Sequence, residues 1–388
     1  MKVAEVIVVG AGVVGASVAF HLAERGVDTL VLDREGPAAG STARSGALIR
    51  AHYPTALEAD LAWESLTEYF EPWGERVGGG CGFTRTGFAY LVGEENVGVL
   101  EHNVAMQREV GVETGLVGPE ELDEIDPALR TDGLALAAYE PRGGYADPAA
   151  TAVGFVRAAR ALGARFERRR VTGLLSHGDS IRGVRTTEGP LYAETVVLAA
   201  GAWTVSLTEG VGLVLPIRPA RVWVALFERP YELPTHLTLI DTTEGFYARP
   251  AAEHATLVGG RNSLEWLPGP DEPTPEPDGA FVAGVSRKLG RRIPALFGAP
   301  YRSGRSGILD MTPDGRPILG PAGPEGLLLA VGWSGTGFKK APAVGAELAR
   351  WITDHSPKRP ELGDYRLARF EEGVPIRGEH EYAAPGPH

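Results

Sequence analysis

Three glycines near the amino terminus have the spacing of a phosphate-binding turn. Gly10, Gly12 and Gly15 form the pattern Gly-x-Gly-x-x-Gly directly after the apolar run Val6–Val9. In such a turn the first glycine allows the bend, the second lets a pyrophosphate approach the backbone, and the third lets a helix pack close to a strand. The helix that follows directs unpaired N–H groups and a partial positive charge at the phosphates. The pattern predicts a dinucleotide site, although a strand–helix unit with purely structural glycines also contains it.

An acidic residue strengthens this interpretation. Asp33 lies 23 residues after Gly10, at the end of a second apolar run that begins at Val27. A carboxylate at this place can accept hydrogen bonds from a ribose diol and disfavours a 2′-phosphate. The alternative is a surface acid at a strand end. Strand, turn, a helix from Ala16 to Arg25 and second strand have the spacing that a dinucleotide needs, but this pattern does not separate NAD from FAD.

Composition excludes several classes of protein. A chain of 388 residues is too long for one compact core, so two domains are expected. The net charge is −12 and basic runs do not exceed residues 168–170, which argues against nucleic acid or an anionic membrane as partner. The single cysteine, Cys81, excludes a disulfide framework and a cysteine-rich metal site.

Targeting signals are not recognisable in the sequence. The first predicted strand begins almost at Met1, so we expect no signal peptide. No apolar run reaches about 18 residues, so we expect no membrane span. The predicted location is cytoplasmic.

Hydrophobic periodicity predicts the elements that must position these residues. Helices are expected at residues 57–73, 94–110, 119–125, 149–162, 278–289 and 343–353. Strands are expected at residues 84–92, 165–172, 181–187, 195–199, 218–227, 236–241, 245–249, 256–260, 302–309 and 327–331. The strands between residues 215 and 262 alternate with proline and aromatic residues, which indicates an antiparallel sheet. The tail after about residue 375 is expected to be loosely ordered.

Taken together, these segments resemble the D-amino-acid-oxidase-like superfamily of FAD-dependent amine oxidoreductases. They are most similar to the branch of sarcosine oxidases, glycine oxidases and the β subunits of dye-linked proline or sarcosine dehydrogenases. The matching stretches are residues 6–33, 40–50, 144–148, 196–203, 215–219, 304–320 and 332–345. The resemblance implies FAD rather than NAD.

The resemblance also implies a fold class and a domain division. The expected class is α/β, with a discontinuous Rossmann-like FAD-binding domain and an α+β substrate domain built on a large, mostly antiparallel sheet. The FAD-binding domain is expected at residues 1–83, 143–214 and 304–388. The substrate domain is expected at residues 84–142 and 215–303.

The expected cofactor site draws on segments that are far apart in the chain. Its expected residues are Gly10, Gly12, Val13, Val14, Gly15, Asp33, Arg34, Ser41, Thr42, Arg44, Ser45, Gly46, Val171, Ala200, Gly201, Trp203, Gly307, Gly335, Thr336, Gly337, Phe338 and Lys339. The segments at 40–50 and 196–203 are rich in small residues, which lets the backbone approach a ligand. The N–H groups at 335–337 can stabilise negative charge on a reduced flavin. A polar loop around residue 42, a plain strand valine at 171 and an ordinary helix start at 335–337 are the alternatives.

Two cations are expected to bind the substrate. Arg50 ends a Leu-Ile-Arg stretch similar to the one that places a carboxylate-binding arginine in sarcosine oxidases, and Lys339 matches that family's carboxylate-binding lysine. A guanidinium can bind a carboxylate bidentately, and an ammonium adds a point charge. Neighbouring cations also favour the neutral amine of the substrate. Surface ion pairs are the alternative, and Lys340 is expected to be solvated.

Four departures from the family pattern carry expectations of their own. Gly307 stands where monomeric sarcosine oxidases attach FAD to a cysteine, so FAD is expected to be non-covalent. Residues 145–148 offer no histidine for the FMN that heterotetrameric relatives anchor there. Glycine oxidases place substrate-binding arginines where this chain has Leu309 and Gly335. Leu257 stands where monomeric sarcosine oxidase has an oxygen-activating lysine, and Arg261 follows with an uncertain aim.

The predicted function is FAD-dependent oxidation of the C–N bond of a small amino acid or secondary amine. Hydride passes to the flavin N5, and the resulting imine hydrolyses. Oxygen and another electron acceptor remain open, as do a partner subunit and a homo-oligomer. A dehydrogenase subunit that needs a partner chain, a flavoprotein without catalysis and an NAD-dependent dehydrogenase are the alternatives.

Overall fold

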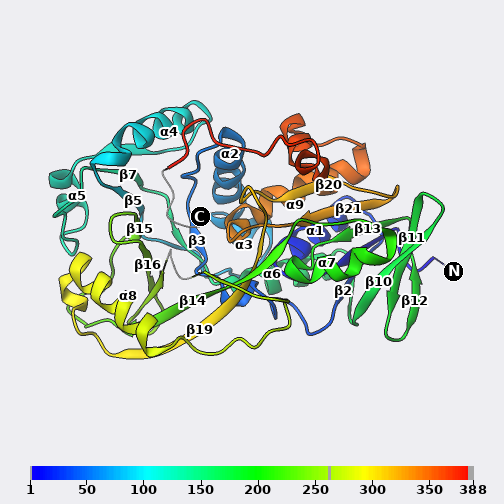
Figure 1. Cartoon of the computed structure of the whole chain (residues 1–388), viewed down its shortest axis with the longest axis horizontal. Helices are drawn as coiled ribbons and strands as arrows, with labels where there is room; N and C mark the ends of the chain where they lie inside the picture. The colour runs from blue at the N-terminus through cyan, green and yellow to red at the C-terminus, as the bar shows by residue number, and fades with distance from the viewer. Residues whose placement is uncertain (1, 261–263, 383–388) are drawn as a thin grey trace.

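The glycine-rich segment directly follows a central strand of a mostly parallel sheet (Figure 1). In the computed structural model, which describes residues 2–260 and 264–382, a six-stranded sheet has the order β20-β21-β13-β1-β2-β9. Its strands are β1 (Val6–Val9), β2 (Thr29–Asp33), β9 (Arg165–Arg168), β13 (Thr195–Leu198), β20 (Ile318–Pro321) and β21 (Leu327–Val331). All neighbours are parallel except β20 and β21. Strand β1 is central and buried on both faces, which accounts for its unbroken β-branched sequence.

Helices cover this sheet. Helix α1 (Val13–Glu24) packs against α6 (Pro148–Ala161) and α9 (Gly337–Asp354). The contact between α1 and α9 is close, because a Cβ atom at Gly345 would lie 2.2 Å from Ser17 Oγ. Helix α9 begins at Gly337, six residues earlier than predicted. Pro342 lies in the second turn, where its missing N–H leaves out the one helical hydrogen bond that would reach the oxygen of Phe338.

The predicted helix at residues 57–73 is interrupted. It consists of α2 (Ala56–Ser65), a π-helical turn (Leu66–Phe70) and α3 (Trp73–Arg76). Pro72 has no N–H group, so it cannot continue the helical ladder. Helix α2 packs on α9, where Ser65 Oγ accepts a hydrogen bond of 3.1 Å from the N–H of Ala343.

A second, larger sheet forms the other half of the molecule (Figure 1). In the part of the chain that is described, its order is β18-β14-β17-β16-β15-β5-β7-β6, with β19 paired to β14. Its strands are β5 (Phe88–Val92), β6 (Gly115–Val117), β7 (Leu136–Glu140), β14 (Arg218–Glu228), β15 (Thr238–Asp241), β16 (Phe246–Ala251), β17 (Ala255–Gly260), β18 (Glu265–Trp266) and β19 (Tyr301–Met311). Neighbours are antiparallel except β5 and β15, so the predicted mostly antiparallel sheet is confirmed.

Helices α5 (Pro119–Ile125) and α8 (Gly279–Arg292) pack with Ala89 and Leu91 on one face of the large sheet, and α4 (Val97–Glu109) packs with Tyr90 and Val92 on the other face. Strand β19 pairs with β14 from Tyr301 to Met311. The predicted domain boundary at residue 304 therefore falls inside a strand, and the division into domains stays a prediction.

Two small sheets complete the fold. One contains β10 (Val171–His177), β11 (Ser180–Thr186) and β12 (Gly189–Tyr192), and the other contains β3 (Leu48–Ile49), β8 (Gly144–Tyr145) and β4 (Thr84–Arg85). The predicted strand at residues 84–92 is split at Gly87, whose φ of +75° suits glycine. The backbones at Gly144 and Thr84 are so close that a Cβ atom on Gly144 would lie 2.1 Å from the Thr84 oxygen.

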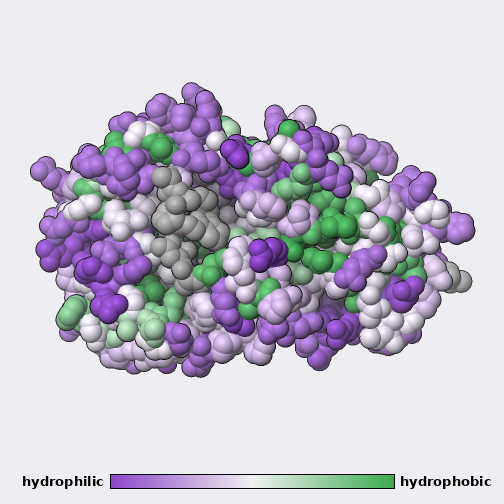
Figure 2. Space-filling view, in the orientation of Figure 1, coloured by the Kyte–Doolittle hydropathy of each residue, from purple (hydrophilic) through white to green (hydrophobic). Residues whose placement is uncertain are grey.

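Residues 376–382 of the carboxy-terminal tail are held by hydrogen bonds to distant parts of the chain, contrary to the prediction of a loose tail. The N–H of Ile376 donates to Asp314 Oδ2 at 3.1 Å, and Tyr382 Oη lies 2.6 Å from His52 Nε2. These partners are distant in sequence, so no local pattern announced them. Hydrophilic residues cover most of the face seen in Figure 2. Among the described helices, none has the length and apolar character required to cross a membrane.

A buried ion cluster joins α2 to α9. Glu58 of α2 bonds Lys340 of α9 through Oε1, and its Oε2 lies 3.0 Å from Arg316 Nε. Lys340 is only 1% exposed, so the prediction that it is solvated is wrong. Burial alone would raise the pKa of Glu58, but Lys340 and Arg316 outweigh burial and lower this pKa to about 2. The ionised carboxylate is therefore the state that the fold stabilises.

We predict that Glu58→Gln destabilises the protein strongly, because it leaves Lys340 buried without a counter-charge and removes one of the two carboxylates that pair with Arg316. The free energy of unfolding should fall by about 3–5 kcal/mol at neutral pH. Because the folded pKa is depressed, the stabilisation is present above the usual pKa of 4.5 and is lost as pH falls toward about 2. The difference in the free energy of unfolding between the variant and wild type should therefore become smaller as pH falls from 4.5 toward 2.

Urea unfolding of both FAD-loaded proteins measures this difference. Glu253→Gln is the matched control, because its carboxylate pairs with Arg302 at the surface and should contribute no more than about 1 kcal/mol. Equal losses in the two variants would contradict the role of the cluster.

Candidate functional site

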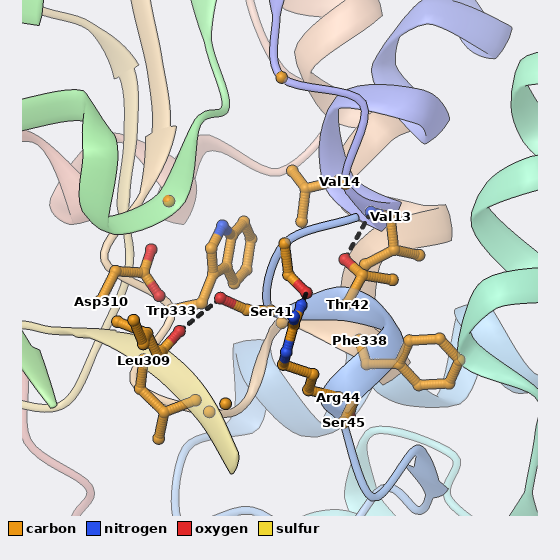
Figure 3. Close-up of a pocket in the computed structure, with 18 of the residues that line it drawn as sticks. Val13, Val14, Ser41, Thr42, Arg44, Ser45, Leu309, Asp310, Trp333 and Phe338 are labelled. Carbon is orange, nitrogen blue, oxygen red and sulfur yellow. Dashed lines mark hydrogen bonds between the residues drawn. The ribbon is translucent and has the colours of Figure 1, made fainter. Parts of the chain in front are cut away.

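One cavity of about 740 Å³ collects the residues singled out from the sequence (Figure 3). Its lining includes Gly10, Gly12, Val13, Val14, Asp33, Arg34, Ser41, Thr42, Arg44, Ser45, Gly46, Arg50, Val171, Ala200, Gly201, Trp203, Gly307, Gly335, Gly337, Phe338 and Lys339. Gly15 and Thr336 are the two expected residues outside the lining. A Cβ atom on Gly15 would lie 2.0 Å from the Gly10 oxygen, which agrees with its expected role in packing α1 on the sheet.

The glycine turn leaves an open cradle at the start of α1. Gly10 has a φ of +105°, and a Cβ atom there would lie 2.5 Å from the oxygen of Ala199 on the neighbouring strand. A Cβ atom on Gly12 would lie 3.2 Å from Thr42 Oγ1, inside the cavity wall. A backbone without side chains at a helix N-terminus fits the pyrophosphate of FAD.

Asp33 is oriented for a ribose by backbone contacts. Its Oδ2 accepts the N–H of Ala11 at 2.8 Å, and its Oδ1 accepts the N–H groups of Glu35 and Gly36 at 2.9 Å. A carboxylate has about four acceptor positions, so lone pairs remain for ribose hydroxyls. The donor set therefore fits the adenosine end of FAD.

The same end of the cavity is bridged by a loop from the large sheet. Arg34 and the indole N–H of Trp203 both donate to Asp271 Oδ1, at 2.8 and 2.7 Å. The guanidinium of Arg34 also lies 4.7 Å from the centre of the Trp203 ring. Asp271 was not expected from the sequence, because the proline- and acid-rich segment around it carries no periodic signal.

Three polar residues expected at the phosphates also hold backbone (Figure 3). Thr42 Oγ1 accepts the N–H of Val13 at 3.0 Å, and Ser41 Oγ donates to the oxygen of Ile308. Arg44 donates to the oxygens of Ala39 and Gly40 at 2.6 and 2.9 Å. These bonds fix the small-residue segment against α1 and β19. Contacts of these side chains with the cofactor stay a prediction.

The N-terminus of α9 also reaches the cavity. Gly335, Gly337 and Phe338 line the cavity there. The hydroxyl of Thr336 instead donates to the oxygen of Trp333 at 2.8 Å. Positive helix ends stabilise negative charge, so this end is suited to the charge that a reduced flavin carries.

Arg50 enters the cavity from the residue after β3. Pairing of Ile49 with Gly144 sets its direction, and its guanidinium donates to the oxygen of His52. Arg50 is 9% exposed and has no ion-pair partner within the described residues. Behind it, Glu140 Oε2 accepts the N–H of Ala51 at 2.8 Å, and burial raises the pKa of Glu140 to about 7.

Lys339 lines the same part of the cavity from α9. It is 7% exposed, and its Nζ makes no hydrogen bond or ion pair with residues 2–260 and 264–382. Burial lowers its pKa well below the usual 10.5, and the charges of Arg50 and Lys340 lower it further, against an opposing effect of Glu58. An anion bound here would favour the protonated amine. The pair Arg50 and Lys339 can therefore bind a carboxylate.

Several lining residues were missed. The large sheet contributes Tyr90, Val222, Trp223, Val224, Ile240, Tyr247 and Gly260 to the lining, and Leu264 lines it from just before β18. Strand alternation could have divided these residues between two faces, but it does not tell which face meets the cavity. Asp310 also lies there; its Oδ2 accepts the N–H of Gly332 at 2.7 Å, and burial raises its pKa to about 6. Arg261 lies outside the described residues.

Comparisons with known proteins agree with this geometry. The family model described as FAD dependent oxidoreductase matches residues 5–351. The 4-methylaminobutanoate oxidase (formaldehyde-forming) of Paenarthrobacter nicotinovorans is 28% identical over 365 residues, which are 90% of this chain but only 44% of that relative. Sarcosine oxidase subunit beta of an Arthrobacter species is 28% identical over 400 residues, covering 98% of this chain and 94% of the relative.

A solved structure is similar over nearly the whole chain. L-Proline dehydrogenase from P. horikoshii has a TM-score of 0.89 and 29% sequence identity, covering 96% of this chain and 99% of that one. The likeness confirms the predicted fold class. The first curated relative above is more than twice as long as the matched region, so this chain corresponds to part of it.

We predict that the bound flavin is non-covalent. Gly307 carries no side chain, and Cys81 is buried outside the described lining of the cavity. Acid or heat should release FAD from the purified yellow protein into the supernatant, where its absorbance is measured after centrifugation. Colour that remains with the precipitated protein would contradict this prediction.

Proposed function

This chain belongs to the family of FAD-dependent oxidoreductases, and we propose that it oxidises the C–N bond of a small amino acid whose amine is secondary. One observation carries the proposal: Arg50 and Lys339 line the same cavity as the glycine turn suited to FAD. The named substrates of the three relatives above, 4-methylaminobutanoate, sarcosine and L-proline, each combine a secondary amine with a carboxylate. FAD as cofactor and oxidoreductase activity follow from the family itself.

The chain's own residues orient the substrate and set its charge. When bound, FAD would supply the acceptor for a hydride, which carries two electrons, from the carbon next to the amine. The guanidinium of Arg50 would bind the substrate carboxylate bidentately, and the ammonium of Lys339 would add charge. A carboxylate fixed at one end of the cavity holds the rest of a small substrate in one orientation. The same two cations would disfavour a protonated amine and so favour the neutral form that can be oxidised.

The wall of the cavity supports a small, partly apolar substrate. Tyr90, Ile240 and Tyr247 line it from the large sheet. Tyr247 is partly buried, and desolvation raises the pKa of its phenol to about 12, so the hydroxyl stays neutral at ordinary pH. A neutral, largely apolar wall excludes water and strengthens the interaction of the two cations with a carboxylate.

Anaerobic reduction of the bound flavin tests the proposal. Glycine, sarcosine, proline, dimethylglycine and D-amino acids are added in turn, with the amides of sarcosine and proline as neutral controls. A secondary amino acid should bleach the flavin fastest, and its amide should do so far more slowly. Bound FAD that none of these amines reduces would favour a flavoprotein without catalysis.

A second candidate is a dehydrogenase subunit that passes electrons to a partner chain. The likeness to sarcosine oxidase subunit beta over nearly its whole length favours this alternative. Copurification of a stoichiometric partner from the native organism would support it, whereas a single-chain homo-oligomer active with dyes would not. The cytoplasmic location inferred from the sequence stays a prediction.

We predict that Arg50→Ala and Lys339→Met each weaken reduction by a carboxylate substrate. Loss of one charged hydrogen-bond partner should cost on the order of 1.5–3 kcal/mol in transition-state binding, measured as kcat/KM. Arg302→Ala is the control, because Arg302 forms an exposed pair with Glu253. Unchanged anaerobic rates in both cavity variants would refute the assignment.

We also predict that artificial electron acceptors turn the enzyme over faster than air does. A fixed positive charge stabilises superoxide during the first electron transfer, and the position of the oxygen-activating lysine of the related oxidases is Leu257 here. Leu257 is 1% exposed and does not line the cavity. Stopped-flow reoxidation measures the rate with oxygen directly. A rate typical of efficient oxidases, with stoichiometric hydrogen peroxide, would show that another group supplies the charge.

A further inference from the structure

Three cations surround the ring of one buried tyrosine. The guanidinium carbon of Arg50 lies 4.5 Å from the centre of the Tyr53 ring, Lys340 Nζ lies 4.6 Å from it, and Lys339 Nζ lies 5.8 Å from it. All three distances fall within the range of cation–π attraction, which is stronger when the partners are desolvated. Tyr53 is 2% exposed and does not itself line the cavity.

The hydroxyl of Tyr53 does not account for its presence. Its Oη is buried and has no hydrogen-bond partner among the described residues. A buried hydroxyl without a partner costs free energy, so phenylalanine would be the cheaper residue if only volume mattered here. The phenol oxygen does increase the electron density of the ring, and the ring is the part that meets the cations.

The backbone of Tyr53 is held independently of the cations. Gln107 of α4 donates from Nε2 to the oxygen of Tyr53 at 2.9 Å, and its Oε1 lies 3.0 Å from His52 Nδ1. The backbone is thus fixed from α4, and the side chain packs with Ala59 and Ala62 of α2, whereas Lys339 and Lys340 arrive on α9.

The charges need such a platform. Lys340 is paired with Glu58, but Arg50 and Lys339 have no ion-pair partner among the residues described. Burial and the charge of Arg50 lower the pKa of Lys339, so the protonated form that binds a carboxylate needs a further source of attraction. The face of an aromatic ring carries partial negative charge and attracts both, without competing as a full anion would for the position of a substrate carboxylate.

We propose that Tyr53 is a positioning residue that holds Arg50 and Lys339 side by side through its ring, and thereby sets the preference for substrates that carry a carboxylate. This inference rests on the proposed function, because it assumes that the two cations bind a carboxylate. The hydroxyl makes no hydrogen bond within the described residues, and it contributes only the small electron density that it adds to the ring. The ring acts through the two cations rather than through contact with the substrate.

Carboxylate binding and substrate preference test this role in the FAD-loaded protein. Acetate is titrated against the visible spectrum of the bound flavin in wild type, Tyr53→Phe and Tyr53→Leu. Tyr53→Leu should weaken acetate binding roughly 5- to 30-fold, as expected for loss of desolvated cation–π contacts, while Tyr53→Phe should stay within about threefold. In Tyr53→Leu, kcat/KM should fall for the amino acid that reduces wild type and change little for its neutral amide.

A shape-conserving series guards against misfolding. The series starts from the Tyr53→Phe variant, in which the new phenylalanine is replaced by analogues with one, two and five ring fluorines. Fluorine withdraws electron density from the face of the ring, so acetate affinity should fall stepwise along the series. Phe227→Leu is the control for loss of a buried ring, because Phe227 lies in the core of the large sheet. It should leave acetate affinity unchanged.

The outcomes separate two failures. Wild type that binds acetate while Tyr53→Leu and the fluorinated series bind it equally well would overturn the role of Tyr53 and leave the proposed function intact. Loss of affinity in Tyr53→Phe as large as in Tyr53→Leu would also overturn it, because the hydroxyl would then be the active group. Wild type that binds no acetate would overturn the proposed function and this inference together.

Discussion

The burial of positive charge beside the cavity is the constraint on which the site depends. Lys340 pairs with Glu58, which joins α2 to α9, and Arg316 pairs with both Glu58 and Glu381. Arg50 and Lys339 lie close to them without an anion of their own among the described residues. Each buried charge is costly unless it is paired. The cluster at Glu58 holds α2 and α9 together. Arg50 and Lys339 lack a negative partner among the described residues, and a bound carboxylate can supply that negative charge.

Two adjacent lysines divide these tasks because they stand on a helix. Successive residues of an α-helix project about 100° apart, so Lys339 and Lys340 cannot share a direction. Lys339 lines the cavity, and Lys340 turns to Glu58 and Thr336. The structural lysine thus fixes the first turn of α9 and, with it, the position of the lysine that faces the ligand. The two lysines therefore have different tasks: Lys340 stabilises the packing of α9, and Lys339 faces the ligand.

The sequence predicted best what short-range spacing determines. The turn at Gly10 and the acid at Asp33 belong to one strand–helix–strand unit, and their placement follows from local rules. The burial of Lys340 could not be predicted, because its partner Glu58 is 282 residues away. The cavity wall at Tyr247 was missed for a related reason, since strand alternation defines two faces without saying which one meets a ligand. Long-range pairing therefore decided most of what the patterns left open.

The segment from Arg50 to Tyr53 lies outside regular structure, so side chains must satisfy its backbone. Glu140 accepts the N–H of Ala51, and Gln107 donates to the oxygen of Tyr53. Between them, His52 is buried against Gln107 and Tyr382; burial, aided by the charge of Arg50, lowers the pKa of His52 to about 3. The imidazole therefore stays neutral at ordinary pH and adds no charge beside Arg50. Because His52 is neutral, the segment carries only the charge of Arg50. Lys339 can therefore approach it from α9.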